Sequence, residues 1–281
     1  MPTQTEKALR FQALHQSSET FVVANPWDAG TARLLAGIGF SALSTTSSGL
    51  AFTFGRRDGN VSRDESLANA RSIVEATTLP VAADLENGYG PSPEFVAETI
   101  RLAAETAGVV GGSIEDASGD PAHPIYDFNH AVERIAAASA AVRALPFPFI
   151  LVARAENYLN DRPDLEDTIR RLQAFEAAGA EVLFAPGITR PEDIRTVCAS
   201  VGKPVNHLIG FKGAPLLSIR ELGVLGVRRV SIGSAFSRSA MTAFLHAARE
   251  VFQNGTFNFA ADTPYMSELA DLFGDPEGAR P

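Results

Sequence analysis

The chain has 281 residues, of which 45% are hydrophobic and 20% charged, and its formal net charge is -9. This acidic balance argues against binding to nucleic acid or to an anionic membrane surface, so we expect a small diffusible substrate. The polar N-terminus lacks the apolar segment of a signal peptide, and no run reaches the roughly 18 apolar residues of a membrane helix, which predicts a cytoplasmic protein. The single cysteine, Cys198, excludes an intrachain disulfide and a cysteine-rich metal site.

Short apolar runs of strand length recur along the chain. Most of them lack a regular alternation of polar and apolar residues, which suits strands covered on both faces, as strands of a parallel sheet are. The runs cover residues 20–25, 40–46, 80–86, 108–115, 148–154, 180–186, 203–209 and 227–233.

Segments with helical periodicity separate these runs. In residues 92–108, Ser92 is a favourable N-cap, Pro93 occupies the first helical position, and Gly108 provides a stop. Residues 164–179 place apolar side chains three and four positions apart and also end at a glycine. Strand and helix therefore alternate along the chain.

Eight repeats of strand and helix predict a (β/α)8 TIM barrel, a fold that commonly needs about 250 residues. The alternative is an open doubly wound sheet, but its dinucleotide-binding fingerprint is missing after every predicted strand. We expect the barrel in residues 1–255, with a long last helix over 234–255. The tail, 256–281, is rich in apolar residues and should pack on the barrel or on a neighbouring subunit.

Polar residues follow most of the predicted strands. In a (β/α)8 barrel, the catalytic groups come from the C-terminal strand ends and the loops after them, so these residues should meet at one rim. Those closest to the predicted strand ends are Asn25, Trp27, Asp28, Ser48, Asp58, Asp84, Glu86, Glu115, Asp116, Arg154, Glu156, Asn206 and His207.

Three acids form the most informative group. Alternation along a strand would place Asp84 and Glu86 on the same side, and Glu115 follows the next strand. Carboxylates this close repel one another, and a divalent cation such as Mg²⁺ relieves the repulsion, with Mn²⁺ as the alternative ion. The competing interpretation is that these acids cap helices or pair with nearby lysine and arginine.

Arg154 lies at the end of a buried run, where a guanidinium needs a partner. A substrate carboxylate is one candidate, and a structural ion pair with Glu115 or Glu156 is the other. Residues Ser48, Gly49 and Leu50 offer consecutive backbone N–H groups that could hold an anionic oxygen. We interpret His123 and His207 as structural residues, since isolated histidines usually are.

Four motifs resemble the isocitrate lyase and phosphoenolpyruvate mutase superfamily, over about residues 10–250. They are NPWDAGTARLLAGIGFSALSTTSSGLA (25–51), DLENGYG (84–90), SIED (113–116) and ARAE (153–156). The resemblance implies a (β/α)8 barrel whose last helix is often exchanged between subunits of a homodimer or homotetramer. It also implies a Mg²⁺ ion that holds a 2-oxo or 2-hydroxy carboxylate.

The resemblance also assigns roles to individual residues. Asp84 would bind the metal directly, while Asp58, Glu86 and Glu115 would act through waters. The pyruvate-like part of the substrate would be surrounded by Trp27, Ser48, Gly49, Leu50 and Arg154. We expect Asp58, Arg154 and Glu115 to be catalytic, with Asp58 moving with its loop. The predicted substrate-binding residues are Trp27, Ser48, Gly49, Leu50, Asp84, Arg154 and Asn206.

The loop after the fourth strand decides between reactions in this superfamily. Its sequence here, ASGDPAHP (117–124), lacks the cysteine of the K-[KR]-C-G-H motif, which argues against an isocitrate or methylisocitrate lyase. It also lacks the lysine or asparagine found in mutases and phosphonopyruvate hydrolases, although ARAEN (153–157) is closer to the mutase branch. Our first hypothesis is a Mg²⁺-dependent lyase or decarboxylase that works through a pyruvate-enolate-like intermediate. Phosphoryl chemistry and a non-catalytic 2-oxo acid binding protein are the alternatives.

Overall fold

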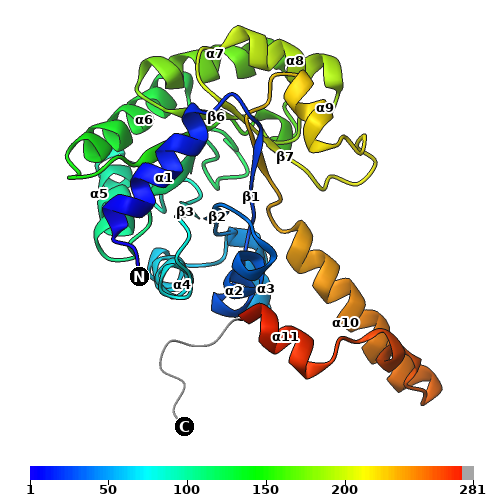
Figure 1. Ribbon diagram of the computed structural model, residues 1–281. Helices are drawn as coiled ribbons and strands as arrows, with labels where there is room; N and C mark the ends of the chain where they lie inside the picture. The colour runs from blue at the N-terminus through cyan, green and yellow to red at the C-terminus, as the bar shows by residue number, and fades with distance from the viewer. Residues whose placement is uncertain (274–281) are drawn as a thin grey trace.

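A computed structural model describes residues 1–273, and within them the chain forms a (β/α)8 barrel (Figure 1). All neighbouring strands pair in parallel, in the order β1-β8-β7-β6-β5-β4-β3-β2. A bridge between Ala24 and Leu43 links the first strand to the second and completes the ring, which rules out an open sheet. The strands are β1 (Phe21–Val23), β2 (Leu43–Ser44), β3 (Val81–Asp84), β4 (Gly111–Glu115), β5 (Ile150–Arg154), β6 (Val182–Phe184), β7 (Val205–Leu208) and β8 (Arg229–Ser231).

Helices surround the barrel and carry the chain from each strand to the next. Two short 3-10 segments, η1 (Asn157–Asn160) and η2 (Asn258–Asp262), interrupt the longer connections. The α-helices of the described residues are α1 (Gln4–Gln16), α2 (Ala29–Ile38), α3 (Ser47–Thr53), α4 (Arg63–Glu75), α5 (Pro93–Glu105), α6 (Phe128–Arg143), α7 (Leu165–Ala177), α8 (Pro191–Ser200), α9 (Ile219–Val224), α10 (Ala235–Asn254) and α11 (Met266–Phe273).

The local signals read from the sequence mark the helix ends correctly. The Ser92 hydroxyl accepts a hydrogen bond from the backbone N–H of Phe95, and Pro93 is the first residue of α5. Gly108 and Gly179 follow α5 and α7 with φ angles of 75° and 107°, in the left-handed region that glycine adopts without a steric penalty. Capping and termination are local effects, so the sequence alone is enough to predict them.

The helix α1 closes the end of the barrel at which the strands begin. Its Lys7 ammonium donates hydrogen bonds to the carbonyls of Val74 and Thr77, just before β3. The fully buried ring of Phe11 enters the barrel interior beside Gly111, where a Cβ atom would lie only 2.9 Å from the ring. A side chain at residue 111 would therefore displace Phe11, and the open end of the barrel is the one where the strands finish.

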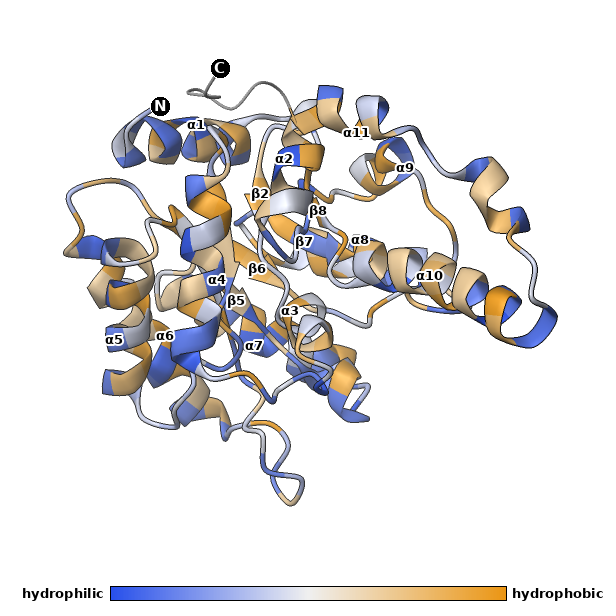
Figure 2. Ribbon diagram, turned by 90° about the horizontal axis from the view of Figure 1, so that it is seen from below, coloured by the Kyte–Doolittle hydropathy of each residue, from blue (hydrophilic) through white to orange (hydrophobic). Residues whose placement is uncertain are grey.

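The last long helix, α10, projects away from the barrel (Figures 1 and 2). Among its 20 residues only Ser237 is buried, while the apolar side chains of Phe244 and Phe252 are 70% and 91% exposed. The chain then returns, and α11 packs on α2, where the Arg33 guanidinium donates to the Phe273 carbonyl at 2.6 Å. No helix within residues 1–273 combines the length and the hydropathy needed to cross a membrane.

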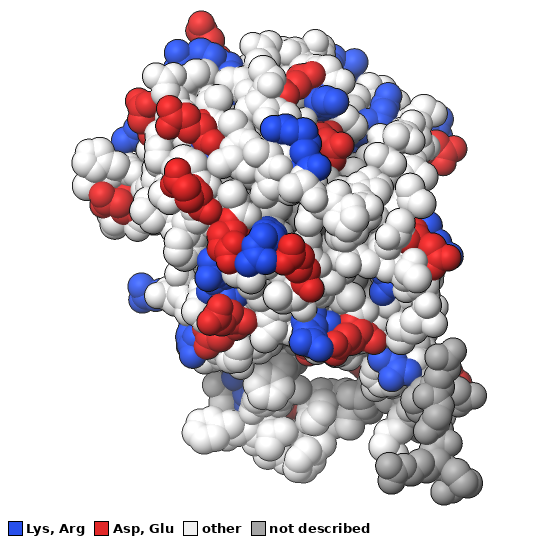
Figure 3. All heavy atoms as spheres, turned by 90° about the vertical axis from the view of Figure 1, so that its left-hand side faces the viewer, with Lys and Arg blue, Asp and Glu red and all other residues white. Residues whose placement is uncertain are grey.

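The face of the barrel that carries α5 and α6 mixes acidic and basic side chains (Figure 3). On α5, Arg101 pairs with Glu98 at 2.7 Å and with Glu105, at helical spacings of three and four residues. Exposed pairs of this kind contribute little to stability, because water screens the charges and the long side chains lose freedom.

Candidate active site

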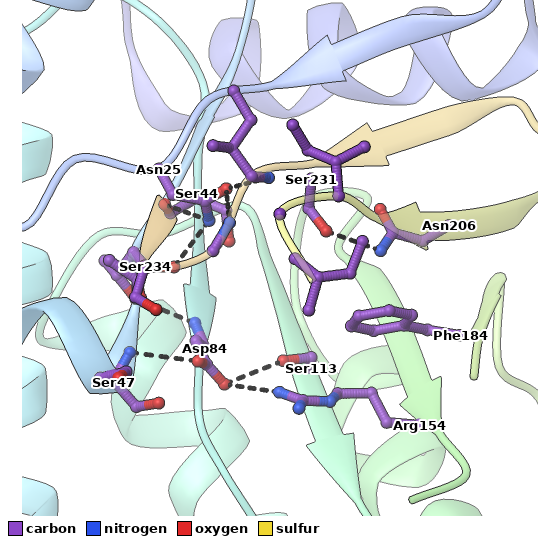
Figure 4. Close-up of a pocket in the computed structure, with 18 of the residues that line it drawn as sticks. Asn25, Ser44, Ser47, Asp84, Ser113, Arg154, Phe184, Asn206, Ser231 and Ser234 are labelled. Atoms are coloured by element: carbon purple, nitrogen blue, oxygen red, sulfur yellow. Dashed lines mark hydrogen bonds and ion pairs between the residues drawn. The ribbon is translucent and has the colours of Figure 1, made fainter. Parts of the chain in front are cut away.

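A cavity of about 380 Å³ opens where the barrel strands end (Figure 4). Strand-end residues form its walls, as expected for the catalytic face of this fold. Arg154 and four other predicted site residues line the cavity, namely Ser48, Asp58, Asp84 and Asn206. The other predicted site residues, Trp27, Gly49, Leu50, Glu86 and Glu115, do not line it. The strand and loop residues that line it include Asn25, Ser44, Ser47, Ser48, Asp58, Asp84, Ser113, Arg154, Phe184, Asn206, Arg229 and Ser231.

Arg154 is the centre of the polar wall. Its Nη1 atom lies 3.0 Å from Asp84 Oδ1 and 3.1 Å from Glu115 Oε2, and its Nη2 atom lies 2.9 Å from Glu156 Oε1. The ring of Phe184 covers the guanidinium, with its centroid 5.0 Å from Cζ. The structure therefore brings Asp84, Glu115 and Arg154 together as predicted, and the guanidinium pairs with both of the glutamates that were its alternative structural partners.

Asp84 is fixed at the cavity wall by several hydrogen bonds (Figure 4). Its Oδ2 atom accepts from the Ser47 backbone N–H at 3.1 Å, and the Ser113 hydroxyl lies 3.5 Å from Oδ1. Its own N–H donates to the Thr45 hydroxyl at 2.9 Å. The donors Ser47, Ser113 and Arg154 hold the carboxylate in one orientation.

Glu86 reaches the site differently from the prediction. The strand β3 ends at Asp84, and Glu86 lies in the following turn with φ 47°, so strand alternation does not apply to it and that premise was wrong. Its Oε1 atom is buried without a hydrogen-bond partner in the described structure. Burial, followed by the charges of Asp84 and Asp58, raises the pKa of Glu86 to about 8. Both the left-handed backbone of Glu86 and its buried Oε1 atom without a partner cost free energy. Such costly arrangements cluster at functional sites.

Asp58 comes from the loop between α3 and α4 and lines the cavity. Burial and the nearby charge of Asp84 raise its pKa, and a hydrogen bond with the Ser47 side chain partly offsets the increase. Asp58 can therefore take up a proton more readily than an ordinary aspartate. This property suits a group that exchanges a proton with a ligand in the cavity.

The acids fit a Mg²⁺ ion that one protein carboxylate binds directly. Within residues 1–273, no three histidine, cysteine, aspartate or glutamate side chains are grouped so that they could ligate a metal together. Glu115 faces Arg154, which is compatible with the water-mediated role that the resemblance gave it, and the metal-binding roles of Asp84, Glu86 and Glu115 stay predictions. Mg²⁺ usually keeps several waters and takes one or two carboxylates, and the unpartnered Glu86 Oε1 is a ready acceptor for such a water.

The backbone donors expected at Ser48, Gly49 and Leu50 are largely occupied. The N–H of Gly49 donates to the Thr46 hydroxyl at 3.3 Å, and that of Leu50 donates to the Thr46 carbonyl at 3.0 Å. Both bonds belong to the start of α3, so the predicted nest of three free N–H groups is not formed. Trp27 does not line the cavity, and its Cβ atom lies close to Gly49, where an added Cβ would be 3.1 Å away.

The two histidines have no place in the site. His207 lies outside the cavity wall, and burial lowers its pKa to about 4, so it stays neutral at pH 7. The side chain of His123 is 85% exposed in the loop after β4 and lies 3.4 Å from Asp120. Asn206 does line the cavity, where its amide donates to the Ser231 hydroxyl at 2.9 Å.

Asn25 and Arg229 matter more than the sequence suggested. The Asn25 amide donates to the Ser44 and Thr45 carbonyls, and its Oδ1 accepts from two N–H groups after β8 at 2.8 and 2.9 Å. One side chain thus joins three strands at the seam of the barrel. We did not single out Arg229, although alternation with Ser231 along β8 places both on the inner face.

Replacement of Glu86 by glutamine is expected to change how stability depends on pH in the metal-free protein. The pKa of Glu86 rises from an ordinary value of 4.5, expected in the unfolded chain, to about 8 in the folded protein. Between pH 4.5 and 8, the folded protein therefore keeps a proton on Glu86 that the unfolded chain has lost. Wild-type stability should therefore fall as the pH rises from about 4.5 to 8. The Glu86→Gln variant should melt roughly 5 to 10 °C higher than wild type at pH 8, with the difference disappearing near pH 4.5.

Thermal unfolding in EDTA across this pH range measures the effect. The exposed Glu19→Gln variant is the matched control, and it should follow the wild-type curve. Equal melting temperatures for wild type and Glu86→Gln at pH 8 would show that Glu86 ionises normally.

Comparison with known proteins identifies the class of this barrel. Residues 11–252 match the phosphoenolpyruvate phosphomutase family. A crystal structure from Burkholderia cenocepacia J2315, of a protein classed by inference as a lyase or mutase, is 55% identical, with a TM-score of 0.94 and 97% of each chain covered. The 2-methylisocitrate lyase of Escherichia coli K12 is 30% identical over 268 residues, which cover 90% of this chain and 87% of that protein.

A solved 2,3-dimethylmalate lyase is described as a member of the phosphoenolpyruvate mutase and isocitrate lyase superfamily. It is 28% identical, with a TM-score of 0.84, and the match covers 98% of this chain and 95% of that one. The chain therefore belongs to the isocitrate lyase and phosphoenolpyruvate mutase superfamily of enzymes. The family resemblance predicted from the sequence motifs is confirmed.

Proposed function

We propose that the protein is a Mg²⁺-dependent lyase or decarboxylase that cleaves a carbon–carbon bond of a small 2-oxo or 2-hydroxy carboxylic acid. The observation that carries the proposal is the Asp84 carboxylate, held at the cavity wall by Ser47, Ser113 and Arg154. The relatives named 2-methylisocitrate lyase and 2,3-dimethylmalate lyase support this class of reaction. The missing loop cysteine separates this chain from the first of them.

The acids of the site can hold the cation as the superfamily resemblance implies. Asp84 would bind Mg²⁺, or Mn²⁺ in its place, while Asp58, Glu86 and Glu115 would contact it through waters. A bound divalent ion supplies positive charge where negative charge develops on an enolate oxygen. Burial, followed by the charges of Asp84 and Asp58, raises the pKa of Glu86, and a bound cation would favour its charged form.

The remaining side chains orient the substrate and manage its protons. Arg154 holds Asp84, Glu115 and Glu156 in place, and its position on the cavity wall lets it also contact a substrate carboxylate. Asp58 is the candidate to deliver a proton to the carbon left after bond cleavage, because its pKa is raised and it lines the cavity.

Phosphoryl chemistry is the second candidate function. The match to the phosphoenolpyruvate phosphomutase family and the ARAEN sequence at 153–157 favour it. The same acids and Arg154 would then face a phosphonate or phosphate in place of a second carboxylate. The two candidates differ in their products, so one set of assays separates them.

A substrate panel with and without Mg²⁺ tests the proposal. Oxaloacetate, methylisocitrate-like acids and malate-like acids are incubated with the protein, and release of pyruvate or glyoxylate is followed by coupled assays with an EDTA control. Phosphonopyruvate and phosphoenolpyruvate are followed by phosphorus NMR in parallel. Mg²⁺-dependent release from at least one acid supports the lyase. Conversion of a phosphorus compound alone would favour the second candidate, and silence on every compound would favour a binding protein.

We also propose that the protein is a homodimer or homotetramer in which α10 packs on a neighbouring subunit. The exposed phenylalanines of α10 support this arrangement, since none of residues 1–273 covers Phe244 or Phe252. Light scattering after size exclusion should give the mass of a dimer or tetramer, and Phe252→Asp should shift the mass toward the monomer. The adjacent exposed substitution Gln253→Asp is the control and should leave the mass unchanged. A monomeric wild-type protein would contradict the proposal.

A further inference from the structure

Arg134 is a fully buried arginine in the middle of α6 to which the proposed reaction gives no role. The residue is only 1% exposed, and none of the carboxylates in residues 1–273 forms an ion pair with it. The two acids at the end of β4, Glu115 and Asp116, pair with Arg154 and Arg171 instead. A buried cation without a carboxylate needs other acceptors, and their position indicates what the residue does.

All the hydrogen bonds that this guanidinium donates end in the turn that follows β3, residues 86–91, called the β3 turn below. Its Nη1 atom donates to the carbonyls of Gly90 and Pro91 at 2.7 and 2.6 Å, and its Nη2 atom donates to the Asn87 carbonyl. The ring of Tyr126 covers the guanidinium, with its centroid 4.2 Å from Cζ. A residue that only packed α6 against other helices would bond to those helices, so these contacts indicate a role in the turn.

The backbone of the β3 turn is strained. Glu86 and Tyr89 have φ angles of 47° and 63°, in the left-handed region that costs free energy for residues with a Cβ atom. Strained conformations of this kind persist only where surrounding contacts hold them. Arg134 supplies three such contacts with one planar group, and the Thr99 hydroxyl supplies another by donating to the Gly88 carbonyl at 2.8 Å.

The conformation of the β3 turn determines where Glu86 lies. The Glu86 carbonyl accepts a hydrogen bond from the Glu115 N–H at 3.0 Å, and the Glu86 N–H donates to Asp84 Oδ1 at 3.4 Å. Its side-chain Oε1 atom is buried and has no hydrogen-bond partner among the described residues. Since no partner holds this oxygen atom, its position depends on the backbone of the turn.

We propose that Arg134 is a positioning residue for the Mg²⁺ site, which acts by holding the β3 turn and, through it, the Glu86 carboxylate. Arg134 does not line the cavity, so it acts through the turn and not on a ligand. The inference rests on the proposed function, in which Asp84 binds the cation and Glu86 contacts it through a water.

Calorimetric titrations with Mg²⁺ alone test the assignment. Arg134→Met leaves an unbranched apolar side chain in the buried position and removes the donors to the turn. It should weaken Mg²⁺ binding by about tenfold to a hundredfold, the range typical of residues that orient metal ligands. Arg134→Lys should recover part of the affinity, because an ammonium donates to carbonyls but lacks the planar fork that reaches all three.

Arg143→Met is the matched control, because Arg143 lies on the same helix but is exposed and donates to the Ser139 hydroxyl at 2.7 Å. This variant should bind Mg²⁺ as wild type does.

A double-mutant cycle separates positioning of Glu86 from general support of the fold. If Arg134 acts through Glu86, Arg134→Met should cost no more than about a further twofold in Mg²⁺ affinity when Glu86→Gln is already present. Losses that combine independently would show that Arg134 supports the fold in general, and they would overturn the inference.

Hydrogen exchange followed by mass spectrometry is the second measurement, and Arg134→Lys is the second variant if the methionine substitution prevents folding. In the metal-free lysine variant, the peptide that contains residues 86–91 should exchange faster than in wild type, whereas peptides of α1 should be unchanged. Equal exchange of the β3 turn in both proteins would contradict the inference.

Failure of this inference and failure of the proposed function give different results. If wild type binds Mg²⁺, Asp84→Asn does not, and Arg134→Met matches wild type, only the inference is overturned. If wild type does not bind Mg²⁺, the proposed function fails and the inference fails with it.

Discussion

Replacement of Asp84 by asparagine is expected to lower kcat/KM for the best acid substrate by at least about a thousandfold. Asparagine keeps the shape of the side chain and can still accept the hydrogen bond from the Ser47 N–H. It removes the negative charge that would hold Mg²⁺, and it weakens the contact with Arg154, which lies 3.0 Å away. The loss should therefore appear both in catalysis and in metal affinity.

Steady-state kinetics and Mg²⁺ titration by calorimetry measure the two effects of the Asp84 substitution. The control is Asp64→Asn, which changes an exposed aspartate in the first turn of α4 and should leave both quantities unchanged. If Asp84→Asn retained wild-type Mg²⁺ affinity, the metal would have to bind elsewhere. Melting temperatures of both variants separate a catalytic loss from unfolding.

Replacement of Arg154 by methionine is expected to destabilise the protein by about 3 to 5 kcal/mol at pH 7. Three carboxylates, those of Asp84, Glu115 and Glu156, would lose the cation that compensates them within 3.1 Å. Burial already raises the pKa of Glu115 and of Glu156, and the arginine opposes that shift. Without it, the carboxylates would be forced toward their protonated forms.

Urea unfolding of wild type and Arg154→Met at several pH values tests this expectation. The deficit should shrink as the pH is lowered, because protonated carboxyl groups no longer need the cation. Lysine at this position should recover only part of the stability and of the substrate affinity, since an ammonium is a point charge that cannot reach all three partners.

The matched control for Arg154 is Arg101→Met on α5. Arg101 also contacts two carboxylates, but at the exposed surface, and its removal should have a far smaller effect. If the two variants lost equal amounts of unfolding free energy, burial would not explain how strongly the Arg154 ion pairs stabilise the protein.

Much of the fold could be predicted because its signals are local. Each of the eight apolar runs contains one of the strands β1 to β8, and Ser92 and Gly179 mark helix ends as expected. The meeting of Asp84, Glu115 and Arg154 could be predicted as well, because parallel strands of one barrel end at one rim.

The finer geometry of the site depends on contacts that the sequence does not display. The left-handed backbone at Glu86 ends the alternation of side chains along β3, and no residue pattern in DLENGYG predicts that change. The N–H groups of Gly49 and Leu50 are occupied because α3 starts one residue after Thr46. Arg229 was passed over because the run that contains it was interpreted as a strand only.

The position of α1 has a consequence for the order of events at the site. The fully buried Phe11 ring fills the barrel at the end where the strands begin, so a ligand in the cavity has no exit on that side. In the proposed reaction, both fragments of the cleaved acid would leave toward the end where the strands finish, and we expect the deeper fragment to leave last. Product-inhibition patterns should accordingly reveal an ordered release, with one product competing directly with the substrate and the other not.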